Sequence, residues 1–338
     1  MLSSVRFGRG LSGAAALALF AGCSAGNSSG PAIPSTYPGA AGQSIATSLS
    51  YVPHFKQIDA LEGNMPAPDT TLRFDNPDLF DPAAPKAGVY GANYGNAAGD
   101  QLGGYFKLFA LPATSKSKAV CEGGLNKVAE INDIAVDSKG TLFVPGLVPK
   151  DLTSGIVLTY AKNTCTESKT KFTEKSGEPA DIAFATDGTD YVMDIVNFPK
   201  MTNGQIEVYP KGKTSPTRTL QLPGERIGTG RGQGLGLGIA TDSKNNVYAT
   251  YINTNSGTDI TVFANGKGKG KILQNASGTS YVGMTFDKNA NLIVAATSSG
   301  TGSIQVFKPP YTGSPRSFPA KGSPVDVKLD AAGTNLYA

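Results

Sequence analysis

The chain repeats one short sequence pattern five times. Each copy starts with Asp or Gly, alternates apolar and polar residues, passes through a small turn and returns through a second apolar run. The copies are DIAVDSKGTLFV from Asp133, DIAFATDGTDYV from Asp181, GIATDSKNNVYA from Gly238, GMTFDKNANLIV from Gly283 and DVKLDAAGTNLYA from Asp326. Their spacing of roughly 43 to 57 residues, with several short strands in each unit, predicts a radial array of small β-sheets.

A second pattern follows the first four copies, and an earlier example precedes them. It reads GYFKLF from Gly104, GIVLTY from Gly155, GQIEVY from Gly204, TDITVF from Thr258 and GSIQVF from Gly302. The pattern predicts a third strand after each hairpin. The aromatic residues that end it are Phe109, Tyr160, Tyr209, Phe263 and Phe307. We expect them to fill the space between neighbouring sheets, because repeat proteins bury equivalent positions at equivalent interfaces.

Segments such as NVYATYINTNSGTDITVF and NLIVAATSSGTGSIQVF resemble the NHL and YVTN families of β-propeller repeats. The resemblance covers residues 87–338 and implies an all-β fold, a β-propeller of about six four-stranded blades. Trp is absent, which does not suit WD40 repeats. The last blade begins at Pro324 and stops within its expected second strand. Two explanations stay open: the N-terminal region supplies closing strands, or the sequence is a fragment.

The N-terminus has the features of an export signal. Arg6 and Arg9 precede an apolar stretch, residues 11–21, that is too short to span a bilayer. The following FAGC resembles a bacterial lipobox, which implies cleavage before Cys23 and acylation of that residue. We therefore expect a signal peptide at 1–22, the lipidated Cys and a flexible spacer at 23–44, and an N-terminal extension at 45–86 that is a candidate source of closing strands. An ordinary secretory signal is the alternative. The expected location is the cell envelope, at the outer membrane if the source has one.

Charge and histidine content exclude several functions. Without Arg6 and Arg9 the net charge falls to about +2, which does not indicate nucleic-acid binding. His54 is the sole histidine, so triads and multi-histidine metal sites are disfavoured. Cys121 and Cys165 remain after Cys23 is assigned, and in an oxidising envelope they are a candidate disulfide. The separation of equivalent positions in adjacent blades leaves that pairing open.

Asp133, Asp181 and Asp326 occupy one repeat position just before the inner strand, so they are expected near the mouth of the central channel. With Asn132 they form a candidate Ca²⁺ site, since Ca²⁺ takes hard oxygen ligands. In outline this resembles the channel site of SMP-30-like lactonases. The alternative is that these carboxylates bond loop amides. Asp137, Asp242, Asp287 and Asp330 recur four residues later and are expected to hold hairpin turns.

Two basic segments complete the candidates. Arg226 and Arg231 give charge to the glycine run that starts at Gly228, which is a candidate anion-binding loop. Lys267, Lys269 and Lys271 form a turn that is either simply solvated or in contact with an anionic polymer or lipid. The sequence favours a monomeric binding propeller that recognises an envelope protein or polysaccharide, with no certain cofactor. A Ca²⁺-dependent lactonase-like hydrolase is the alternative, because the fold hosts both.

Overall fold

The computed structural model shows an almost entirely β protein. It describes residues 4–6, 88–93, 104–110, 117–124, 127–129, 131–149, 151–174, 177–196, 203–223, 235–253, 257–320, 322–329 and 335–338. Within these ranges the only helical element is the 3₁₀ turn η4 (Ala264–Gly266). No helix in the described ranges has the length and apolar character needed to cross a membrane.

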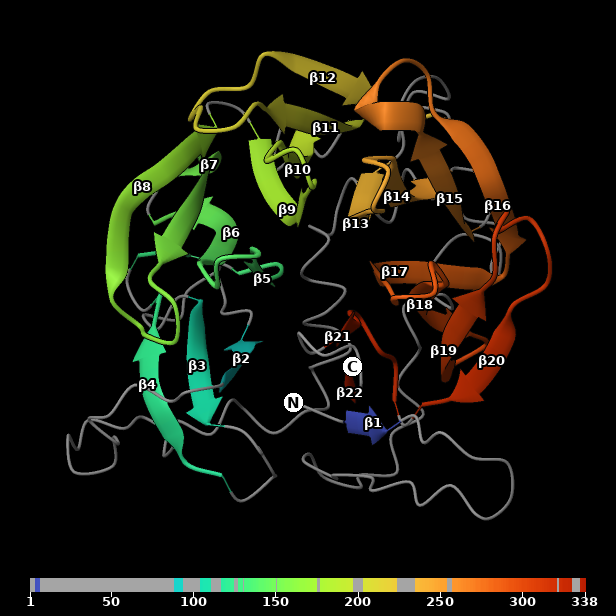
Figure 1. The fold of residues 1–338 in the computed structure, drawn as a ribbon, viewed down its shortest axis with the longest axis horizontal. Helices are drawn as coiled ribbons and strands as arrows, with labels where there is room; N and C mark the ends of the chain where they lie inside the picture. Colours follow the sequence, from blue (N-terminus) through green and yellow to red (C-terminus); the bar gives the residue numbers. More distant parts are fainter. Residues whose placement is uncertain are drawn as a thin grey trace.

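The strands form six antiparallel sheets arranged as the blades of a propeller (Figure 1). The first three sheets are β2 (Gly88–Asn93), β3 (Tyr105–Ala110) and β4 (Ala119–Gly123); β5 (Ala135–Val136), β6 (Leu142–Val148), β7 (Asp151–Tyr160) and β8 (Glu167–Glu174); and β9 (Gly177–Phe184), β10 (Asp190–Val196), β11 (Asn203–Tyr209) and β12 (Arg218–Gln221). The next two are β13 (Leu235–Thr241), β14 (Val247–Asn253), β15 (Gly257–Phe263) and β16 (Lys271–Ser277); and β17 (Thr279–Phe286), β18 (Leu292–Ser298), β19 (Thr301–Phe307) and β20 (Arg316–Pro319). The all-β propeller predicted from the repeats is confirmed.

The repeated first pattern forms the hairpin between the first and second strands of a blade. In four blades the fourth turn residue has a positive φ, at Gly140, Gly188, Asn245 and Ala290. The turn Asp accepts backbone N–H groups: Asp137 Oδ1 from Lys139 and Thr141, Asp242 Oδ1 from Lys244 and Asn246, and Asp287 Oδ1 from Asn289 and Asn291. The turn role expected of these residues is confirmed, and Asp187 plays it as well by accepting from Thr189 N. Asp330 lies outside the described residues.

Aromatic side chains pack between neighbouring sheets. Tyr160, Tyr209, Phe263 and Phe307 are fully buried, as the repeat predicts. Phe109 is an exception, because it is only partly buried. Phe106, three residues earlier in β3, makes the contact instead, with its ring centroid 4.7 Å from that of Tyr160. Such edge-to-face pairs add to the apolar burial that holds blades together.

A disulfide joins the first and second sheets. Cys121 in β4 is bonded to Cys165 in the turn between β7 and β8, with their Cα atoms 5.9 Å apart. The sequence left this pairing open, because the number of residues between two cysteines does not give the distance between their Cα atoms in adjacent blades. The two positions are not equivalent, since Cys121 is in the last strand of its sheet and Cys165 in a turn, and that offset brings them within reach.

The last sheet contains strands from both ends of the chain. It is made of β21 (Lys328–Leu329), β22 (Asn335–Tyr337) and β1 (Ser4–Arg6), with Val5 paired to Leu336. The strand that completes this sheet therefore comes from residues inside the expected signal peptide. The extension at 45–86, which the sequence offered as the source of closing strands, lies outside the described residues.

Candidate functional site at the propeller axis

The first strands of the blades bend where they pass the axis. In β9, β13 and β17 the pairing with the second strand shifts register at one place, next to Asp181, Gly238 and Gly283 respectively. A β-bulge of this kind redirects side chains and backbone groups. In the third, fourth and fifth blades the first strand therefore bends at this repeat position.

Asp181 is held rigidly by two blades. Its side chain is completely buried. Oδ1 accepts the backbone N–H of Ile182 at 2.6 Å, and Oδ2 accepts that of Ile239 in the next blade at 2.8 Å. Its carboxyl group also lies close enough to that of Asp133 for its charge to raise the pKa of Asp133.

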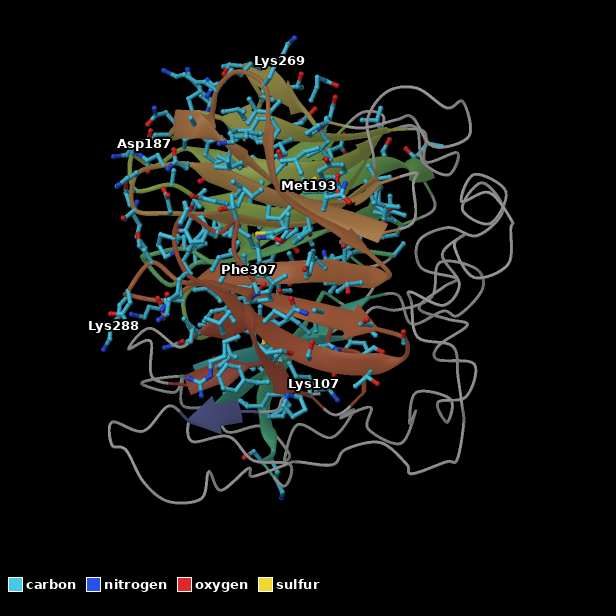
Figure 2. The ribbon with its side chains drawn as sticks, turned by 90° about the vertical axis from the view of Figure 1, so that its right-hand side faces the viewer. Lys107, Asp187, Met193, Lys269, Lys288 and Phe307 are labelled. Carbon is cyan, nitrogen blue, oxygen red and sulfur yellow. A yellow bond between two sulfur atoms is a disulfide. The ribbon has the colours of Figure 1, made fainter. Side chains whose placement is uncertain are left out.

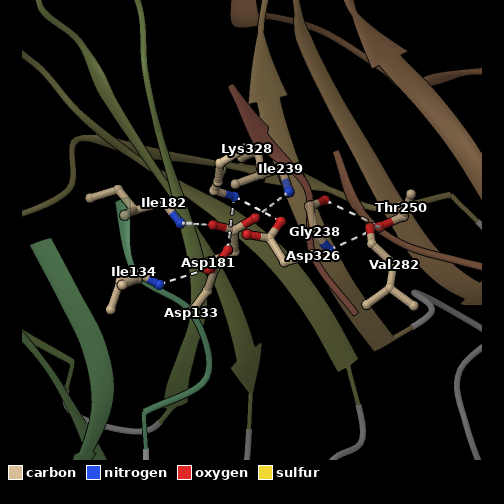
Figure 3. Close-up of polar contacts among 10 residues, drawn as sticks. All are labelled: Asp133, Ile134, Asp181, Ile182, Gly238, Ile239, Thr250, Val282, Asp326 and Lys328. Carbon is tan, nitrogen blue, oxygen red and sulfur yellow. Dashed lines mark hydrogen bonds and ion pairs between the residues drawn. The ribbon is translucent and has the colours of Figure 1, made fainter. Parts of the chain in front are cut away.

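Lys328 joins the other two aspartates across the ring (Figure 3). Its Nζ lies 3.1 Å from Asp133 Oδ2 and 2.9 Å from Asp326 Oδ1. Asp133 belongs to the second blade and Lys328 to the last, so this contact spans residues that are 195 positions apart. The second oxygen of Asp133 accepts the backbone N–H of Ile134 at 2.6 Å. Three carboxyl groups thus converge on one ammonium group.

The cluster opens to solvent on the side of Lys328. The exposed fraction of the side chain is 34% for Lys328, 27% for Asp326 and 12% for Asp133. Burial, followed by the charge of Asp181, raises the pKa of Asp133 to about 7. Burial, followed by the charge of Asp133, raises the pKa of Asp326 to about 6. Burial also raises the pKa of Asp181, with Lys328 opposing the shift.

The charge of the cluster is only partly balanced. Burial disfavours the ammonium form of Lys328, but Asp133, Asp326 and Asp181 outweigh that effect and raise its pKa. A single positive charge faces three carboxyl groups, of which Asp133, with a pKa of about 7, takes up protons near neutral pH and Asp326, with a pKa of about 6, takes them up at slightly lower pH. The site can therefore hold and release protons in the range in which ordinary carboxylates stay ionised.

Glycine occupies the same repeat position in the fourth and fifth blades because backbone fills that space. A Cβ atom on Gly238 would lie 2.4 Å from Val282 O, and one on Gly283 would lie 2.1 Å from Asp326 Oδ1. Thr250 completes this part of the ring: its hydroxyl accepts from Gly238 N at 2.9 Å and donates to Val282 O at 2.5 Å. Gly238 and Gly283 thus occupy, around the propeller axis, the repeat position that carries Asp in the other copies.

The donors do not suit the expected Ca²⁺ ion as they are arranged here. Among the described residues, no group of three or more His, Cys, Asp or Glu has a metal-binding arrangement. The Lys328 ammonium already supplies a cation between two of the aspartates. Asn132 points elsewhere, because its Nδ2 donates to Glu178 Oε1 at 2.8 Å and to Pro179 O at 3.0 Å. The three aspartates meet as expected, but Lys328 rather than Asn132 is their partner.

Sequence reasoning missed Lys328, although its copy of the repeat carries a signal. Two residues after the Asp or Gly, the other copies have Ala135, Ala183, Ala240 and Thr285. A lysine at a repeat position that otherwise carries Ala or Thr indicates that this copy places a charged side chain near the axis. Of the remaining candidates, Cys23, His54, Arg226 and Arg231 lie outside the described residues.

A second acidic pair is buried on β10 and β11, the second and third strands of the third blade. Gln205 Nε2 bridges Asp194 Oδ2 at 3.4 Å and Glu207 Oε1 at 3.3 Å, and the hydroxyl of Tyr209 donates to Glu207 at 2.9 Å. Burial, then the charge of Glu207, raises the pKa of Asp194 to about 7. These groups are covered, which favours a role inside the blade over contact with a ligand.

Comparison with known proteins gives similarity of fold. No family model and no curated protein matches the sequence. Among solved structures, the chain is similar to a protein from Lactobacillus plantarum (13% identity over 73% of this chain and 74% of that one, TM-score 0.47). It is also similar to virginiamycin B lyase from Staphylococcus aureus (13% identity over 72% of this chain and 80% of that one, TM-score 0.44). A third similar structure is the WD40 β-propeller domain of Doa1 (7% identity over 69% of this chain and 71% of that one, TM-score 0.43). At these identities the likeness concerns the β-propeller fold alone.

Proposed function

We propose that this protein is an exported, lipid-anchored β-propeller that binds an envelope protein or polysaccharide through its blade loops. The observation that supports it best is the position of Lys328, whose Nζ lies 2.9 and 3.1 Å from two axial carboxylates. The place where a metal-dependent hydrolase would hold its cation contains the protein's own ammonium group. The axial cluster then serves to join blades, and recognition falls to the loops.

The disulfide supports export. Cys121 and Cys165 are bonded in the structure, and disulfides persist in oxidising compartments such as the bacterial periplasm and the cell surface. Export also agrees with the charged and apolar N-terminal segment and with the lipobox-like sequence before Cys23. Acylation at Cys23 supplies the anchor in this proposal, since buried acyl chains contribute about 0.8 kcal/mol per methylene.

Fractionation of cells that express the full chain tests the anchor. The expected result is a membrane-associated, acyl-labelled protein, and a Cys23→Ala variant that loses both the label and the association. A Cys121→Ala variant provides the control, because it alters a cysteine outside the lipobox-like segment and should keep the label. Membrane association of the Cys23→Ala chain without any change in labelling would contradict the anchor.

The Ca²⁺-dependent alternative has its own test. Residues 24–338 are unfolded thermally in EDTA and in millimolar Ca²⁺. A ligand at about 100 times its dissociation constant adds about 2.7 kcal/mol to the unfolding free energy, which raises the midpoint visibly. We expect no rise, because Lys328 holds the cation position. A large, saturable rise would favour the hydrolase and call for a screen of lactones and phosphoesters.

A further inference from the structure

One end of the propeller is built from hairpin turns. Within a blade, the connection from the first to the second strand and the connection from the third to the fourth strand leave the sheet at the same end. In the second to fifth blades these connections are residues 137–141, 161–166, 185–189, 210–217, 242–246, 264–270, 287–291 and 308–315. We call this end the turn face. Figure 2 shows Asp187 and Lys288, from the first turns of two different blades, on the same side of the molecule.

Hydrogen bonds join the turns of the third and fourth blades and connect the two turns of the fifth. Asn245 Oδ1 accepts from the backbone and the hydroxyl of Thr186 in the preceding blade, at 2.8 and 2.7 Å. Arg218 donates to Gly266 O in the next blade at 2.8 Å. Within the fifth blade, the hydroxyl of Tyr311 donates to Ala290 O at 2.8 Å. The first turns also share one backbone geometry in four blades.

The exposed side chains of the turn face are mainly basic. They are Lys139, Lys162, Lys211, Lys213, Arg218, Lys244, Lys267, Lys269, Lys271, Lys288, Lys308 and Arg316. The acids of the same turns are less available, because Asp137, Asp187, Asp242 and Asp287 accept turn amides. Glu167 pairs with Lys127 at 3.7 Å, and Asp190 is half-buried. Among the residues that the structure describes, basic side chains thus outnumber available acidic ones on this surface.

The composition of the turn face favours a lipid surface over a sugar polymer. None of the Phe and Tyr side chains whose exposure the structure describes is exposed, so the face lacks aromatic rings on which sugars or bases stack. Two large apolar side chains are exposed beside its charges, Val136 at 48% and Ile272 at 43%. Lysines around isolated apolar side chains suit an anionic headgroup layer.

We propose that the turn face docks on an anionic lipid bilayer through its lysines. The lysines are spread over four blades, so a flat layer of anionic headgroups can contact many of them at once. A single linear polymer could contact only some of them. Docking in this orientation leaves the loop connections at the opposite end free for a partner. The contact is electrostatic and does not depend on acylation of Cys23.

Vesicle flotation with the full chain carrying Cys23→Ser tests the proposal without an acyl anchor. We expect binding to vesicles of phosphatidylcholine with 30% phosphatidylglycerol at 50 mM salt, release at 500 mM salt, and no comparable binding to phosphatidylcholine alone. A Lys288→Gln change should weaken binding about fivefold, and changing Lys139, Lys244 and Lys288 together, which lie in the first turns of three blades, should weaken it about 100-fold, because each lysine near such a surface contributes about 1 kcal/mol.

Thr301→Glu is the matched control. It lowers the net charge by one, as Lys288→Gln does, but Thr301 begins β19 at the end opposite the turn face. We expect it to change binding less than twofold. Equal effects of the two changes, or binding that neither salt nor the triple change reduces, would overturn the proposal. Binding to soluble polyglutamate or polyphosphate without binding to vesicles would also overturn it and would make the face a polyanion site.

Discussion

At the scale of single residues, the axial cluster depends on an imbalance of charge. Lys328 is the one ammonium group placed against Asp133, Asp181 and Asp326. Removing one member of a buried ion pair is costly because the partner is left without compensation. The carboxylates of this cluster can instead take up protons, and this response limits the loss.

Replacement of Lys328 by Met should lower the unfolding free energy by about 1–3 kcal/mol. The value lies below the range of about 3–5 kcal/mol for fully buried pairs, because the Lys328 side chain is 34% exposed. Chemical denaturation at pH 7.5 measures the change. Lys244→Met is the control, since it removes an exposed lysine and should alter stability by less than about 0.5 kcal/mol. Equal effects of the two changes would show that the cluster contributes nothing.

The raised carboxyl pKa values predict a stability that falls as the pH rises. The pKa of Asp133 is about 7 and that of Asp326 about 6 in the folded protein, against 3.8 for the unfolded reference. Between about pH 4 and pH 7 the folded state therefore holds protons that the unfolded chain has released. Urea unfolding should give a free energy about 2 kcal/mol lower at pH 8 than at pH 5, after allowance for solvent screening.

Asp133→Asn should flatten this dependence, because an amide cannot titrate. Part of the dependence of the unfolding free energy on pH should remain, since burial also raises the pKa of Asp194 to about 7. A slope identical to that of the unchanged protein would exclude Asp133 as a proton-binding group of the folded state.

At the scale of elements, the sequence predicts the features that depend on neighbouring residues and recur in each repeat. The hairpins follow from alternation with a period of two, and the turn roles of Asp137, Asp242 and Asp287 follow from their place before Gly and Asn. The meeting of Asp133, Asp181 and Asp326 follows from their shared repeat position. Lys328 has no equivalent in other copies, so its contact with Asp133 depends on ring closure. The orientation of Asn132 toward Glu178 is likewise set by packing and not by spacing.

The disulfide between the first two blades should contribute about 3–4 kcal/mol to stability. Cys121 and Cys165 are 44 residues apart, and closing a loop of that length restricts the unfolded chain. A Cys121→Ser, Cys165→Ser double variant should unfold at lower denaturant concentration, and a reductant should lower the stability of the parent but not of the variant. A reductant effect of equal size on both proteins would place the sensitivity elsewhere.

At the scale of the whole molecule, closure of the ring depends on contacts at both of its edges. Toward the fifth blade, the last sheet is anchored by Val327 and Leu336, which pack with Ile293, Ala295 and Ile304. Across the propeller axis, it is anchored to the second blade by the contact between Lys328 and Asp133. The pairing of β1 with β22 adds a third strand but covers only three residue pairs.

These contacts predict that the last sheet survives loss of β1. Cleavage before Cys23 would remove β1, so we expect residues 23–338 to unfold with a free energy within about 1 kcal/mol of that of the full chain. Leu336→Ala in the same shortened chain should cost about 2–4 kcal/mol, because it deletes a core side chain that is only 2% exposed. Denaturant titration of the three proteins compares the two contributions. A loss on shortening that exceeds the loss from Leu336→Ala would mean that β1 closes the ring, and a leader removed on export could not then be the same segment.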